Sequence, residues 1–133
     1  MTEIKSNKSC ITMPISEVYA YLSVPANYEV LMPSTVRSFI ATDDSATLDI
    51  QGLGSVVLAI TERNEPTNIV MLPQNKVPFK FDLQWHLKSL SENETEVQAV
   101  INAELNFMMK MMAEKLLTDF LNVQVHKLSG HLK

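Results

Sequence analysis

The chain has 133 residues, a length that favours one domain, and its 46% hydrophobic and 20% charged residues are typical of a globular protein. The 11 basic and 15 acidic residues give a net charge of −4, which disfavours nucleic acids and anionic membranes as partners because both need a basic face. The single cysteine, Cys10, excludes an internal disulfide. The longest uncharged run, Ile50 to Thr61, is far shorter than the roughly 20 residues of a membrane span, and the polar N-terminus lacks the apolar core of a signal peptide. We therefore expect one soluble, cytoplasmic domain over residues 1–133.

The first part of the chain predicts one strand followed by two short helices. The strand ends before Pro14, because proline has no N–H to donate to a sheet. Ser16 is a suitable N-cap for the first helix, and Pro25 can occupy the first turn of the second, which stops before Pro33. The predicted elements are a strand over 3–13 and helices over 16–23 and 25–32.

From Val36 onward the hydrophobic pattern changes to a period of two, which predicts strands. The clearest strand is 79–90, where every second residue from Phe79 to Leu87 is apolar, so that one face is buried and the other solvated. Short turn-forming segments separate consecutive strands, which favours an antiparallel meander. The predicted strands are 36–42, 46–51, 55–64, 68–72, 79–90 and 95–105.

The last segment, 107–128, changes to a helical period and predicts a long helix. We expect it to dock across the sheet through an apolar stripe formed by Met109, Met112, Leu116, Phe120 and Val123. The stripe is widened by Leu117, Leu121 and Leu128. Residues 129–133 are expected to cap the helix and fray. Four methionines between Met108 and Met112 are either a mouldable wall for an apolar ligand or ordinary core filling.

The order of these elements resembles the START-like, or SRPBCC, superfamily. So does the segment from Met13 to Pro33, in which the matching residues are Val18, Tyr19, Leu22, Pro25, Asn27, Tyr28, Met32 and Pro33. Members include Bet v 1-like proteins, polyketide cyclases and dehydrases, lipid-transfer START domains, coenzyme-Q-binding proteins and activators of the Hsp90 ATPase. The resemblance implies an α+β helix-grip fold. This fold is a curved antiparallel sheet of about seven strands with two short helices and a long C-terminal helix, and a cavity between the sheet and that helix.

Side chains suited to catalysis or metal binding are sparse. The three histidines lack metal-ligand spacing and Cys10 is expected to be a small buried residue, so we expect neither a metal nor another cofactor. The segment 52–54 contains two glycines but is followed by a strand pattern, which indicates a hairpin turn rather than a phosphate-binding loop. Tyr28 either offers its hydroxyl group to a ligand or only packs its helix against the sheet.

These observations favour a protein that binds a small hydrophobic or amphipathic ligand, lipid-like or polyketide-like, in the cavity. One alternative is a polyketide cyclase or dehydratase-like enzyme, which needs an ionisable side chain in the cavity. Another is an interaction protein of the Hsp90-activator type, which would work through an exposed surface. The residues expected to line the cavity are Tyr28, Met32, Phe39, Leu58, Phe81, Leu83, Trp85, Ile101, Met109, Met112, Leu116 and Phe120.

Strands 55–61 and 68–72 are apolar on both faces, so one apolar face would be left exposed. We expect a second copy of the chain to cover it, giving a homodimer. With Val56, Leu58, Ile60, Val70 and Leu72 inside, the outer residues are Val57, Ala59, Ile69 and Met71. The opposite facing is also compatible with the pattern.

Overall fold

The computed structural model describes residues 2–132, which form eight strands, two α-helices and one 3-10 helix. The strands are β1 (Thr2–Lys5), β2 (Ser9–Ile11), β3 (Val36–Ala41), β4 (Ser45–Ile50), β5 (Gly54–Asn64), β6 (Asn68–Pro73), β7 (Phe81–Ser91) and β8 (Glu94–Ala103). The helices are α1 (Ile15–Leu22), the 3-10 helix η1 (Pro25–Leu31) and α2 (Phe107–His131). The helix-grip α+β fold predicted from the sequence is confirmed.

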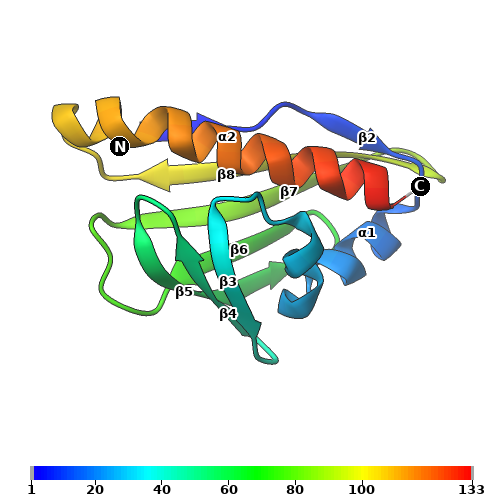
Figure 1. Cartoon of the computed structure of the whole chain (residues 1–133). Coiled ribbons are helices and arrows are strands. Elements are labelled where there is room, and N and C mark those ends of the chain that lie inside the picture. The colour runs from blue at the N-terminus through cyan, green and yellow to red at the C-terminus, as the bar shows by residue number, and fades with distance from the viewer. Residues whose placement is uncertain (1, 133) are drawn as a thin grey trace.

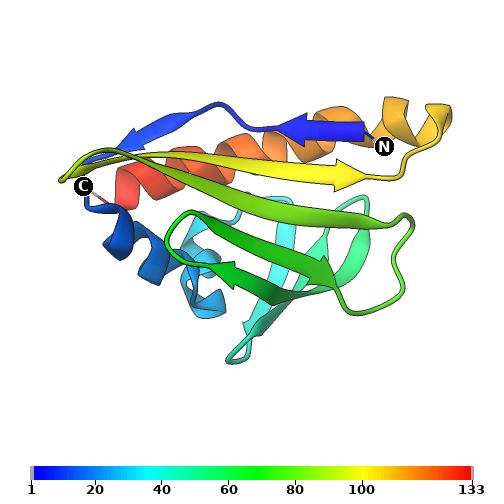
Figure 2. The same cartoon turned by 180° about the vertical axis from the view of Figure 1, so that it is seen from behind.

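The strands form one curved antiparallel sheet with the order β1-β8-β7-β6-β5-β4-β3, and β2 pairs with β8 beside β1. Helix α2 lies across one face of this sheet, and α1 and η1 lie below the C-terminal half of α2 (Figure 1). Seen from behind, the strands lie in front of α2, and none of the helices within residues 2–132 covers their outer face (Figure 2). The apolar side chains of the inner face are therefore buried between the sheet and α2.

The first strand differs from the prediction, because residues 3–13 form two short strands instead of one. The pairing with β8 shifts by one residue between Lys5, which is opposite Val100, and Ser9, which is opposite Val97. Ser6 lies at the break and is buried. Its hydroxyl oxygen accepts a hydrogen bond from the Ala99 backbone N–H (2.9 Å), and its own N–H donates to the Ala99 carbonyl (2.9 Å). A side chain thus replaces part of the backbone ladder at the break.

The step between α1 and η1 is fixed by three hydrogen bonds. The Tyr21 hydroxyl donates to the Asn27 carbonyl (3.1 Å), and the Asn27 side-chain amide donates back to the Tyr21 carbonyl (2.9 Å). The Tyr28 hydroxyl donates to the Leu22 carbonyl (2.6 Å). Two of these bonds satisfy carbonyl groups in the last turn of α1, where helical partners run out, and the third satisfies the Asn27 carbonyl in η1. They explain why asparagine and tyrosine stand together in η1.

Of the two facings of β6 that the sequence pattern allows, the structure has the one with Ile69 and Met71 inside. Ile69 and Met71 are buried, whereas Val70 is half-buried and Leu72 is 39% exposed. The cause is the pairing register: Met71 is opposite Ile60 on β5, and directly paired residues share a face. An irregularity at Thr61 sets this register. Because both faces of the strand are apolar, the sequence pattern did not decide between them.

The buried stripe of α2 also differs from the expected one. Met112 is 78% exposed, Met109, Leu116 and Val123 are only half-buried, and the buried face is formed instead by Ala113, Leu117, Phe120, Leu121, Gln124, Val125 and Leu128. The first turns of α2 extend beyond the end of β8 (Figure 1), and Phe107, Met108 and Met111 in these turns are exposed as well. At its other end the helix continues to His131, through residues that we expected to fray.

Candidate functional site

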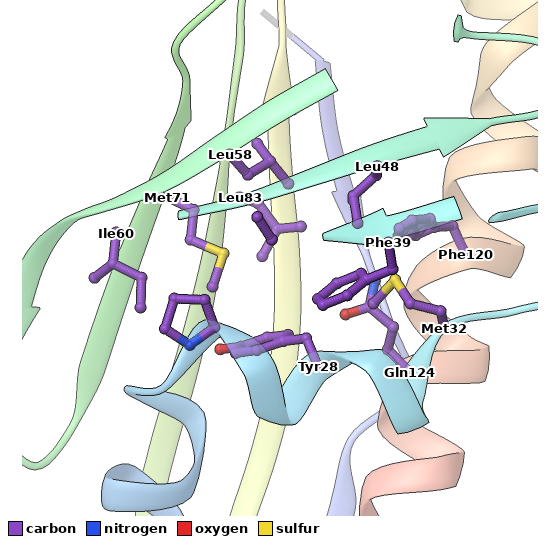
Figure 3. Close-up of a pocket in the computed structure, with 12 residues that line it drawn as sticks. Tyr28, Met32, Phe39, Leu48, Leu58, Ile60, Met71, Leu83, Phe120 and Gln124 are labelled. Atoms are coloured by element: carbon purple, nitrogen blue, oxygen red, sulfur yellow. The ribbon is translucent and has the colours of Figure 1, made fainter. Parts of the chain in front are cut away.

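An apolar hollow lies between η1, the sheet and α2 (Figure 3). Its cavity volume is about 20 Å³, room for about one water molecule. The side chains around it come from elements far apart in the sequence, so only the tertiary structure brings them together. They are Pro25, Tyr28, Met32, Phe39, Ala46, Leu48, Leu58, Ile60, Met71, Leu83, Phe120 and Gln124. We call this space the inner hollow.

A second space of about 30 Å³, the middle hollow, lies further toward the N-terminal end of α2. It is lined by Ile50, Leu53, Val56, Leu58, Phe79, Phe81, Leu83, Ile101, Leu117 and Phe120. It shares Leu58, Leu83 and Phe120 with the inner hollow, so these three side chains form the wall between the two spaces.

A groove of about 300 Å³ opens at the surface beside the N-terminal half of α2. It is lined by Gly52, Leu53, Pro78, Phe79, Met109, Met112, Ala113 and Leu116. The groove shares Leu53 and Phe79 with the middle hollow. The groove, the middle hollow and the inner hollow therefore follow one another from the surface to Tyr28, and each is separated from the next by two or three apolar side chains.

Eleven of the twelve residues proposed from the sequence line one of these three spaces. Tyr28, Met32, Phe39, Leu58, Leu83 and Phe120 line the inner hollow, Phe81 and Ile101 the middle hollow, and Met109, Met112 and Leu116 the groove. Trp85 lines none of the three spaces. It is fully buried behind Tyr28, whose ring packs edge-on against the indole with 6.1 Å between the ring centroids.

Sequence reasoning missed several lining residues, of which Gln124 and Phe79 are the most informative. Gln124 lies four residues after Phe120 and four before Leu128, so helical spacing alone places it on the buried face. Phe79 was expected within a strand but precedes β7, and its ring nevertheless lines both the middle hollow and the groove.

The walls of the three spaces carry almost no charge. Among the described lining residues, Tyr28 is the one with an ionisable side chain. Burial raises the pKa of its hydroxyl group well above the ordinary value, and the Arg63 guanidinium lowers it only in part. The hydroxyl group is therefore protonated at neutral pH and is already bonded to the Leu22 carbonyl. The Tyr28 ring, rather than its hydroxyl group, faces the inner hollow.

Two other features of the sequence suggest chemistry, the glycines of segment 52–54 and Cys10; Gly52 borders the groove as part of a turn, whereas Cys10 lines none of the three spaces. Gly52 and Gly54 have positive φ angles of 93° and 86°, and they form the turn between β4 and β5. Cys10 is exposed, contrary to our expectation, because its side chain points to the solvent side of β2. Partial desolvation and then the Glu94 carboxylate raise the pKa of its thiol, which disfavours the reactive thiolate.

Comparison with solved structures supports the same fold over nearly the whole chain. A START superfamily protein from Mycobacterium smegmatis is 17% identical with a TM-score of 0.76, over 98% of this chain and 96% of that one. Norcoclaurine synthase from Thalictrum flavum is 9% identical with a TM-score of 0.78, over 98% and 93%. The di-domain ARO/CYC BexL is 12% identical with a TM-score of 0.72, over 98% of this chain and 46% of that one.

These similarities define the class of protein: the chain has the START-like helix-grip fold shared with Bet v 1-like proteins and polyketide cyclases. No family model and no curated protein sequence matches the chain. Within residues 2–132, no helix is long and apolar enough to cross a membrane.

Proposed function

We propose that the protein binds a small hydrophobic or amphipathic molecule between the sheet and α2. The observation that carries this proposal is the series of three apolar spaces leading from the surface to Tyr28, none of which is lined by a charged residue in the described part of the chain. Sites for small molecules are typically apolar and concave with few polar groups. START and Bet v 1-like neighbours with the same fold support a ligand-binding role.

Binding requires the walls to move, because the inner and middle hollows hold only about 20 and 30 Å³. Met32 and Met71 line the inner hollow, and Met109 and Met112 line the groove. Methionine is unbranched and flexible, so these side chains can repack around molecules of different shape. The site is thus suited to an adaptable fit rather than to a rigid, preformed cavity.

The same walls favour binding over cyclase or dehydratase chemistry. General acid–base catalysis needs a group with a pKa near the working pH. The one ionisable side chain lining the described spaces, Tyr28, has a raised pKa and already donates a hydrogen bond. Two of the structural neighbours are named as a synthase and an ARO/CYC protein. Because the described spaces of this chain lack a suitable catalytic acid or base, we propose that it shares with them the binding of a small molecule and not the reaction.

Fluorescence of the neutral apolar dye N-phenyl-1-naphthylamine tests this proposal. The folded protein is expected to raise the emission of the dye, and Ala46→Leu to weaken binding because Ala46 is buried at the wall of the inner hollow. Ala20→Leu is the matched control, since Ala20 is exposed on α1. Native mass spectrometry of freshly purified protein checks for a bound apolar compound. If the dye binds only when the protein is partly unfolded, the proposal is wrong.

A second candidate function is protein docking of the Hsp90-activator type. The nearly filled interior favours it, and so does an exposed apolar cluster at the N-terminal end of α2. The exposed fractions are 77% for Phe107, 72% for Met108, 71% for Met111 and 78% for Met112. Clustered exposed apolar residues mark interaction sites. This candidate predicts that the protein accelerates the ATPase activity of Hsp90. The double variant Met108→Ser, Met111→Ser should lose this effect, and because neither methionine lines the groove, the variant should not alter ligand binding there.

We further propose a homodimer formed through the outer face of the sheet. The outward apolar side chains are Val57 and Ala59 on β5, as expected, and Val70 and Leu72 on β6 in place of Ile69 and Met71. Ile40 on β3 extends this face, because it pairs with Thr47, which in turn pairs with Val57. Ile40 is 68% exposed. A second copy would cover this apolar row.

A further inference from the structure

Gln124 is the one amide among the side chains that line the inner hollow. It belongs to the buried face of α2 and is only 2% exposed. Figure 3 shows its side chain extending from α2 toward Phe39, so that the amide group lies among the apolar side chains of the pocket. None of the side-chain hydrogen bonds among residues 2–132 involves this amide, and it is not among the fully enclosed unpaired polar atoms, so it borders the free space of the hollow.

An amide in this position is unfavourable for folding by itself. A glutamine side chain offers two N–H donors and one carbonyl acceptor, and buried polar groups are normally hydrogen-bonded. Leucine or methionine at position 124 would fill the same space without an unpaired polar group, and the neighbours Phe120 and Leu128 on the same helix face are apolar. An unpaired amide that faces a hollow is therefore better explained by a partner that is not part of the folded chain.

The other polar groups nearby do not provide that partner. The Tyr28 hydroxyl already donates to the Leu22 carbonyl (2.6 Å). The Trp85 indole N–H has no partner among the described residues, but Trp85 lines none of the three spaces. A buried water needs two to four polar partners, more than this hollow offers. An organic molecule that brings its own polar group fits better.

We propose that Gln124 is the polar anchor of the ligand site, and that the ligand is an apolar molecule with one uncharged hydroxyl or carbonyl group that bonds to this amide. This inference rests on the proposed binding function. The amide can donate to a carbonyl or accept from a hydroxyl, so either group satisfies it. A carboxylate or ammonium group is excluded from this depth, because none of the described lining residues carries the opposite charge that a buried ion needs.

Three probes of one ring system test the anchor: naphthalene, 2-naphthol and 2-naphthoate. Their binding to the wild-type protein is followed by the fluorescence of the probes and of Trp85. We expect 2-naphthol to bind about tenfold more tightly than naphthalene, the usual value of one hydrogen bond, and 2-naphthoate to bind most weakly. In Gln124→Leu the advantage of 2-naphthol over naphthalene is expected to disappear, while naphthalene binds as well as before or better.

Two further variants control the experiment. Met71→Leu changes the wall of the same hollow without changing its polarity, and it should keep the preference for 2-naphthol. Gln124→Met also removes the amide but preserves the unbranched shape of glutamine. It replaces Gln124→Leu in the comparison of 2-naphthol with naphthalene if Gln124→Leu does not fold. Thermal unfolding of each variant is measured in parallel, and removal of the unpaired amide is expected to leave stability equal or higher.

The outcomes separate the anchor from the binding function. If no probe binds to the wild-type protein, both proposals fail. If naphthalene and 2-naphthol bind equally, or if Gln124→Leu and Gln124→Met retain the preference for 2-naphthol, the protein binds apolar molecules but Gln124 is not the anchor. Tight binding of 2-naphthoate that depends on Gln124 would overturn the assignment of an uncharged ligand.

Discussion

At the scale of single residues, Trp85 shows how one side chain can stabilise the core without forming the binding surface. It is fully buried on β7, opposite Ala99 on β8 and Ile69 on β6, and it packs against the edge of Tyr28. Its indole N–H has no hydrogen-bond partner among the described residues. Trp85 therefore stabilises the fold through the packing of its ring and not through a hydrogen bond of its N–H group.

We expect Trp85→Ala to lower the free energy of unfolding by about 3–5 kcal/mol, the range for truncation of a buried aromatic residue. Urea unfolding followed by circular dichroism measures this change, since the variant lacks its tryptophan. Trp85→Phe should cost clearly less, because it keeps a ring against Tyr28 and removes the unpaired N–H. A loss below 1 kcal/mol for Trp85→Ala would show that this position contributes little to packing.

At the scale of elements, the interrupted edge formed by β1 and β2 depends on Ser6. The Ser6 hydroxyl accepts a hydrogen bond from the Ala99 N–H and donates one to the Asn7 carbonyl (2.8 Å), in a buried place where water cannot replace it. Both short strands hold their pairing with β8 on either side of this residue. A single hydroxyl group thus links two strands that the sequence pattern presents as one.

Ser6→Ala is expected to destabilise the protein by about 1–3 kcal/mol, because it leaves the buried Ala99 N–H without this acceptor. Hydrogen exchange of the Ala99 amide, measured by NMR, should become faster than in the wild type. Ser9→Ala is the control, since Ser9 is only half-buried on β2 and its hydroxyl makes no such contact. Unchanged protection of Ala99 in Ser6→Ala would contradict this role.

At the scale of the whole molecule, the outer face of the sheet is uncovered by helices (Figure 2) and carries apolar side chains. Stable dimers bury about 1,200–2,000 Å² in total. The strands β5 and β6 alone offer too little, so the exposed Ile40 on β3 has to contribute.

Replacing Ile40 and Leu72 with lysine together should therefore convert a dimer into a folded monomer, because both side chains are exposed and tolerate a charge. Analytical ultracentrifugation at micromolar concentration measures the change. The control is Leu90→Lys, the same substitution at a 48% exposed site near the end of β7. A wild-type protein that sediments as a monomer would rule out the dimer.

The sequence by itself determined the order of the elements and the fold class, because alternating and helical periods are local properties of the chain. In β7, for example, apolar and polar residues alternate so regularly that the buried face follows directly from the pattern. The motif around Asn27 and Tyr28 also indicated the helical step that three hydrogen bonds fix.

Only the tertiary structure decided which of two equivalent faces is buried. In β6 both faces are apolar, and the register with β5 turned Ile69 and Met71 inward. In α2 two overlapping stripes have nearly the same spacing, and the position of the helix on the sheet selected Leu117 and Leu121 over Met112. The hollows and the unpaired amide of Gln124 arise where these faces meet, since a space between elements depends on how the elements pack and not on the pattern within any one of them.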